Sequence, residues 1–200
     1  MQMKLMSAMA MGAAVAAVAW AGDAVQSEQR TVTVRMSQRG NASVFQAQAV
    51  ASRIFGRIGV RIDWQPDQSS RLLARDSIAI TLSENTPAGQ HPGEFAYAMP
   101  YEGTQIVVFY DRLQTSLTAA RVPSVLGHVL AHEIGHVLQG ISRHSASGIM
   151  KARWEARDYV EMRRNTFEFT GGDIVLIRSG LDDRTPQDSR RASTVAIVAQ

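Results

Sequence analysis

The sequence predicts a single α/β (α+β) domain: a twisted, mixed β-sheet of about four or five strands, a backing helix, a buried helix and a small C-terminal helical part. Three observations predict this fold class. Short β-branched runs that suit strands lie along the first half of the chain, with a segment of helical apolar spacing among them. A later helical run is apolar nearly all round, so other elements have to enclose it. The 200 residues show no internal repeat, and one core suffices for this length.

These patterns place the elements in order. Thr31–Met36 alternates apolar and polar residues, which predicts a strand, and Ser43–Ile58 is predicted to be a helix that ends at Gly59. Four further runs are short, rich in β-branched or aromatic residues and predicted to be strands: Val60–Trp64, Ile78–Leu82, Phe95–Met99 and Ile106–Tyr110.

The second half is expected to be mainly helical. Pro123–Leu138 is the apolar run, and Gly140 is a typical stop because glycine accepts the left-handed conformation that ends helices. Trp154–Arg164 is predicted to be a helix, whereas Asp173–Ser179 suits a short helix or a strand. Residues 182–200 are polar and then weakly apolar, which predicts a mobile C-terminal tail.

The apolar run contains a His-Glu-x-x-His motif at His132, Glu133 and His136. Histidines four apart lie one above the other on a helix face, so both imidazoles can reach one metal ion. Glu133 points about 100° away around the helix, within reach of a metal-bound water. The pattern is typical of zinc hydrolases, in which zinc acidifies water and the glutamate takes its proton. For His128, one turn earlier, packing or hydrogen bonding in the core is the default explanation.

The chain beyond the helix stop offers a third ligand. A return after Gly140 can present His144 to the ion that the first two histidines would hold. Three protein ligands and one water make a catalytic site rather than a closed structural one.

Residues 123–154 resemble the metzincin clan of zinc peptidases. That family has the signature His-Glu-x-x-His-x-x-Gly-x-x-His followed by a methionine turn. In this chain Gly140 comes one residue later than the family's glycine and His144 two residues later than its histidine, so the loop is longer. Gly148-Ile149-Met150 resembles the Met-turn. The run also looks like a group of uncharacterised, secreted bacterial zincin-like proteins.

The resemblance implies a zincin/metzincin-like fold and a zinc-dependent endopeptidase that acts on a peptide or protein substrate. It implies one catalytic Zn²⁺ held by His132, His136 and His144, with Glu133 as general base and Met150 in the Met-turn. An extended peptide could add as a further strand beside the strand at 95–99. A tyrosine could supply an oxyanion donor, although packing is the default explanation for each candidate: Tyr97, Tyr101 and Tyr110.

Two alternatives remain open. A gluzincin-like peptidase would take its third ligand from Glu155, whose separation from His136 is within the range of that group. The cations around Glu155, at Lys151 and Arg157 among others, favour an exposed ion pair instead. A secreted, non-catalytic binding module on a zincin scaffold would hold zinc structurally or not at all. Glu133 argues against this module, because a structural site needs no base.

Residues 1–21 have the pattern of a signal peptide. They contain one lysine, an alanine-rich apolar stretch and the triplet Ala19-Trp20-Ala21, so cleavage is expected after Ala21. The alternative is an uncleaved anchor, for which the stretch is short. The mature protein, with its catalytic domain at 22–181, is expected to be secreted or periplasmic and without stable membrane association.

The amino-acid composition excludes several kinds of bond and binding partner. The chain has no cysteine, which excludes disulfides and any thiol that could hold zinc latent. The net charge is only +3, and the arginines are scattered rather than clustered with aromatic residues or phosphate-binding loops. Nucleic-acid binding is therefore not expected. A monomer is favoured.

Overall fold

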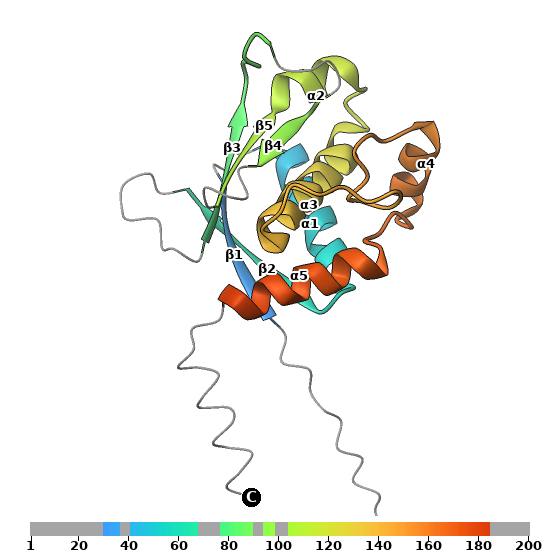
Figure 1. Ribbon diagram of the computed structural model, residues 1–200. Helices are drawn as coiled ribbons and strands as arrows, with labels where there is room; N and C mark the ends of the chain where they lie inside the picture. The colour runs from blue at the N-terminus through green and yellow to red at the C-terminus, as the bar shows by residue number, and fades with distance from the viewer. Residues whose placement is uncertain (1–29, 37–40, 68–76, 90–93, 99–103, 185–200) are drawn as a thin grey trace, which may run out of the picture.

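A mixed β-sheet with helices packed against one of its faces organises the chain (Figure 1). The computed structural model describes residues 30–36, 41–67, 77–89, 94–98 and 104–184. Within these residues the elements are, in order, β1 (Arg30–Met36), α1 (Ala42–Gly56), β2 (Val60–Pro66), β3 (Ser77–Ser83), β4 (Ala96–Ala98), β5 (Gln105–Phe109), α2 (Tyr110–Ser116), α3 (Val122–Gln139), α4 (Ala156–Arg164) and α5 (Gly171–Arg184).

The described strands form a five-stranded sheet in the order β2-β1-β3-β5-β4. β1 pairs in parallel with β2 and β3, and β3 pairs in parallel with β5. The short β4 runs antiparallel to β5, with Tyr97 opposite Val107, and forms an edge of the sheet. The predicted mixed α/β sheet is thereby confirmed.

One face of the sheet is buried because its strands alternate. In β1 the inward residues Val32, Val34 and Met36 are buried while the residues between them are partly exposed. Helices α1 and α3 cover this face (Figure 1). They approach closely at Gly127, where an added Cβ would lie 2.5 Å from the Cβ of Val50. The core therefore lies between the sheet and this helix pair.

Helix α3 is buried along its length, as its composition predicts. Every residue from Val125 to Gln139 is buried. The helix ends at Gly140, which has a φ of 66° and whose N–H donates to the carbonyl of His136. The predicted stop is confirmed, and the chain leaves the helix beside the histidines.

The structure corrects several of the predicted elements. Helix α1 ends at Gly56 rather than at the predicted stop Gly59, and β4 contains Ala96–Ala98 without Phe95. Tyr110 was expected in a strand but begins α2, a short helix held by long-range contacts: Asp111 accepts hydrogen bonds from the main chain and hydroxyl of Thr86. Trp154 lies outside α4, because Glu155 and Asp158 form a capping box that starts the helix at Ala156.

A further correction concerns the C-terminus. The segment 173–179, which suited a strand or a helix, lies within α5. This helix runs past the predicted start of the tail at Asp182, because Leu181 is buried and Arg184 donates to the carbonyl of Val137 at 2.6 Å. The rest of the predicted tail, 185–200, lies outside the described residues, as do the predicted signal segment 1–21 and Met99. Among the helices of the described residues, none has the length and apolar character needed to cross a bilayer.

Candidate metal centre

Two histidines of α3 are fixed by main-chain carbonyls. The Nδ1 atom of His132 lies 2.7 Å from the carbonyl oxygen of Ile149, and the Nδ1 atom of His136 lies 3.1 Å from that of Ile141. A carbonyl can only accept, so each Nδ1 carries the hydrogen and donates it. Each neutral ring then presents an unprotonated Nε2, which is the atom that a metal ion would bind.

The two Nε2 atoms face each other at 3.0 Å. Burial lowers the pKa of His132 to about 3 and also lowers that of His136, so both rings are neutral near pH 7. Two lone pairs pointed at one another repel, and a shared cation would remove that repulsion. Nitrogens bound at about 2.0–2.1 Å to one tetrahedral zinc ion lie roughly 3.4 Å apart, close to the observed separation.

His144 completes a three-histidine cluster. Its ring centroid lies 5.4 Å from that of His132 and 4.9 Å from that of His136. One ligand nitrogen from each of the three rings falls within 4.8 Å of the others. Three neutral imidazoles that converge in this way suit zinc, so the donor set fits the ion implied by the sequence.

Glu133 lies beside the histidines in a cleft of about 1000 Å³. Its side chain is almost wholly buried, and burial raises the pKa of its carboxyl group to about 8; the charge of Glu94, which also lines the cleft, adds to this effect. A nearby cation would favour the ionised carboxylate. Burial and Glu94 therefore favour the neutral form of Glu133, and a neighbouring cation would oppose them.

The segment Gly148-Ile149-Met150 lies directly against α3. Met150 is fully buried, and an added Cβ at Gly135 would lie 2.7 Å from its sulfur. Gly148 has a φ of 73°, and a Cβ there would come within 2.5 Å of the carbonyl oxygen of Glu168, which accepts from the N–H of Ile149 at 3.0 Å. The segment thus supplies the carbonyl that orients His132 and packs the thioether of Met150 against α3 at Gly135, the residue before His136.

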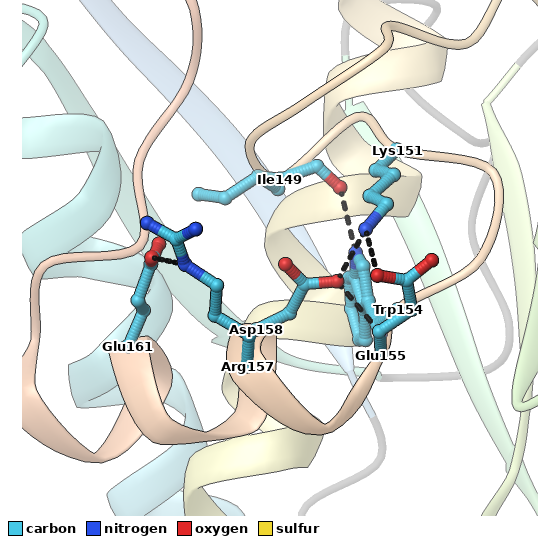
Figure 2. Close-up of polar contacts among 7 residues, drawn as sticks. All are labelled: Ile149, Lys151, Trp154, Glu155, Arg157, Asp158 and Glu161. Carbon is cyan, nitrogen blue, oxygen red and sulfur yellow. Dashed lines mark hydrogen bonds and ion pairs between the residues drawn. The ribbon is translucent and has the colours of Figure 1, made fainter.

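The structure places Glu155 away from the three histidines. Its side chain caps α4, is 73% exposed and lies 3.3 Å from the Nζ atom of Lys151, which also contacts Asp158 at 2.8 Å (Figure 2). His128 is likewise separate, since its Nδ1 lies 2.7 Å from the carbonyl of Ser124 and its ring packs near Phe167. His128 is therefore a buried, hydrogen-bonded core residue, as its default explanation predicts.

Three parts of the chain line the cleft. They are the edge strand β4, helix α3 with its two histidines, and the segment after His144, which includes Trp154 and Tyr159. The indole Nε1 of Trp154 donates to the carbonyl of Ile149 at 3.2 Å (Figure 2). The sequence did not predict that Trp154 and Tyr159 line the cleft, although two aromatic residues within the charged run at 151–159 were a signal for them.

The three tyrosines named from sequence have different positions. Tyr97 lines the cleft on β4 and packs on Phe109. The hydroxyl of Tyr110 accepts a hydrogen bond of 2.7 Å from Asn41, the residue that caps α1, so this tyrosine has a structural role. Tyr101 lies outside the described residues.

Comparison with known proteins identifies a similar fold. The structure is similar to the crystal structure of archaemetzincin from Methanopyrus kandleri, with a TM-score of 0.51 and 14% identity. The match covers 78% of this chain and 98% of that one. No protein-family model matches the chain, and neither does any curated protein. Identity this low shows the fold alone: the chain has a mixed α/β, zincin-like fold that carries a cluster of three histidines.

Proposed function

We propose that this protein is a zinc-dependent endopeptidase of metzincin type, exported and processed after Ala21. One observation carries the proposal: the convergence of His132, His136 and His144 next to the buried carboxylate of Glu133, within an open cleft. The zincin-like fold and the name of the similar protein, archaemetzincin, support this reading. A structural zinc site would need no buried base and would favour a fourth protein ligand.

The residues of the chain have separate roles in this mechanism. His132, His136 and His144 would hold one Zn²⁺, which when bound acidifies water and polarises the scissile carbonyl. Glu133 accepts a proton from the attacking water and then delivers it to the leaving amine. The carbonyls of Ile149 and Ile141 keep the first two imidazoles in the tautomer that leaves Nε2 unprotonated.

The edge position of β4 favours a peptide as the substrate. β4 pairs on one side with β5 and is last in the sheet order of the described strands, and its residues line the cleft. An extended peptide can hydrogen-bond to the main chain of such an edge, and its alternate side chains then enter the cleft. The three-residue length of β4 leaves room for only a few main-chain hydrogen bonds, so side-chain contacts would contribute much of the binding.

The general base gives the sharpest test. Glu133→Gln should retain zinc and the fold yet lower peptide hydrolysis by at least about a hundredfold, because a general base contributes about 10²–10⁴-fold. Zinc content and cleavage of a mixed peptide library by residues 22–200 would be measured. Glu155→Gln is the matched control, an identical change at an exposed ion pair, and should keep wild-type activity. Wild-type protein that holds one zinc but cleaves no peptide would indicate a binding module instead.

A further inference from the structure

A buried carboxylate outside the metal centre connects α5 to the loop that carries His144. Asp173 is fully buried. Its Oδ2 atom accepts from the N–H of Thr170 at 3.0 Å and from the hydroxyl of Thr170 at 2.6 Å, which caps the start of α5. Its Oδ1 atom instead accepts from the hydroxyl of Ser145 and lies 3.8 Å from the guanidinium of Arg143.

The contacts of the two Asp173 carboxylate oxygens are more than helix capping requires. A capping box needs only the contacts to Thr170, and Asp158 provides the equivalent cap for α4 by accepting from the N–H of Glu155. Among the described residues, the Oδ1 atom of Asp173 makes polar contacts only with the loop that carries His144. Arg143 and Ser145 are the immediate neighbours of the third histidine, so both partners of that oxygen flank His144.

His144 needs such support more than the other two histidines do. Carbonyl oxygens hold the Nδ1 atoms of His132 and His136, whereas the ring of His144 forms no hydrogen bond within the described part of the chain. Its side chain is also exposed. The main chain on either side of His144 therefore decides whether its ring can reach the other two histidines.

We infer that Asp173 is the positioning residue for the third histidine of the centre, because it anchors both chain neighbours of His144 to the start of α5. This role rests on the proposed zinc site. The N–H of Ser145 also donates to the carbonyl of Met150 at 2.8 Å, so the same residue closes the loop onto the segment at 148–150. Anchoring holds His144 near the other ligands before the ion arrives and reduces the ordering that binding would otherwise require.

The test separates the loop contact from the helix cap. Ser145→Ala removes the hydroxyl that reaches Oδ1 and leaves the Thr170 cap intact, while Ser145→Thr restores a hydroxyl. Asp173→Asn removes the charge that serves both partners. Asp158→Asn is the matched control, since it makes the same change in the capping box of α4. Zinc affinity would be measured by chelator competition, with cobalt-substituted absorption spectra and thermal unfolding for every variant.

Asp173→Asn should weaken zinc binding by about tenfold or more, the range found when groups that orient metal ligands are lost. Ser145→Ala should weaken it severalfold, and Ser145→Thr should lie near wild type. Asp158→Asn should lower the unfolding temperature yet leave zinc affinity within about twofold. The cobalt spectrum should change in Asp173→Asn and Ser145→Ala only.

Two patterns would overturn the inference. Wild-type zinc affinity in both Asp173→Asn and Ser145→Ala would make Asp173 a cap and no more. An equal loss in Asp173→Asn and Asp158→Asn would attribute the effect to general destabilisation. If Asp173→Asn does not fold, the zinc affinities of Ser145→Ala and Ser145→Thr decide whether the loop contact matters. Failure of the metal centre itself is distinguishable, because His144→Ala would then bind zinc like wild type.

Discussion

The crossing of α3 and α5 provides a quantitative test of the packing. A Cβ at Gly180 would overlap the carbonyl oxygen of Leu138 and lie 2.9 Å from its carbonyl carbon. Both atoms belong to the main chain of α3, so no side-chain rotation can relieve the contact. The overlap with the oxygen sets the displacement, because non-bonded carbon and oxygen atoms stay more than about 3 Å apart. Gly180→Ala should therefore force the helices apart by more than roughly 1 Å.

The free energy can be estimated from three contributions. Alanine in a helix interior gains about 1 kcal/mol over glycine. Overpacking costs about 1–3 kcal/mol. Separation also exposes part of Ile177 and Leu181, the buried residues of α5 near the crossing, at roughly 1 kcal/mol each for partial loss of their burial. The net destabilisation should be about 2–4 kcal/mol, which corresponds to a fall of roughly 5–15 °C in Tm.

Gly172→Ala is the matched control in the same helix. The nearest atom to a Cβ there is the hydroxyl oxygen of Thr170, at 3.9 Å. This variant should be unchanged or more stable by up to about 1 kcal/mol, since only the helix preference of alanine acts. Urea and thermal unfolding followed by far-UV circular dichroism would measure both variants. A Gly180→Ala protein as stable as wild type would refute the close crossing of α3 and α5.

Further predictions concern the site. His144→Ala should weaken zinc binding by about a hundredfold or more, since it removes the proposed third ligand, while Glu155→Ala should bind nearly as wild type. Chelator competition would measure both affinities, and the reverse order would favour a glutamate third ligand. Met150→Ala should lower the free energy of unfolding by about 2–5 kcal/mol, whereas Met150→Leu, which keeps the volume, should cost less than about 1.5 kcal/mol. Equal stabilities of these two variants in urea would contradict the packing of Met150 against Gly135.

Local patterns in the sequence were sufficient to predict much of the fold. Alternation placed β1, and apolar spacing placed α1, because these periods reflect which face of an element is buried. The apolar run up to Gly140 predicted a buried α3 and its end. The spacing of His132 and His136 also determined that they share a helix face, since four residues make about one turn.

Long-range contacts decided the rest. Helix α2 contains few buried residues and depends on the contact between Asp111 and Thr86, which lie far apart in the chain. No local spacing of apolar residues could therefore predict this helix. The extent of α5 depends in the same way on Arg184 and the end of α3.

The three-histidine cluster likewise combines a part that local spacing predicts with a part that depends on long-range contacts. A helix has a fixed geometry, so sequence alone determined the relation between His132 and His136. A loop has none, and His144 comes near them only through contacts with distant segments. The carbonyl of Ile149 orients His132, and the carboxylate of Asp173, on a separate helix, accepts a hydrogen bond from Ser145, the neighbour of His144. A side chain that acts across such a distance leaves no pattern in its own neighbourhood, so only the tertiary structure revealed the role we infer for Asp173.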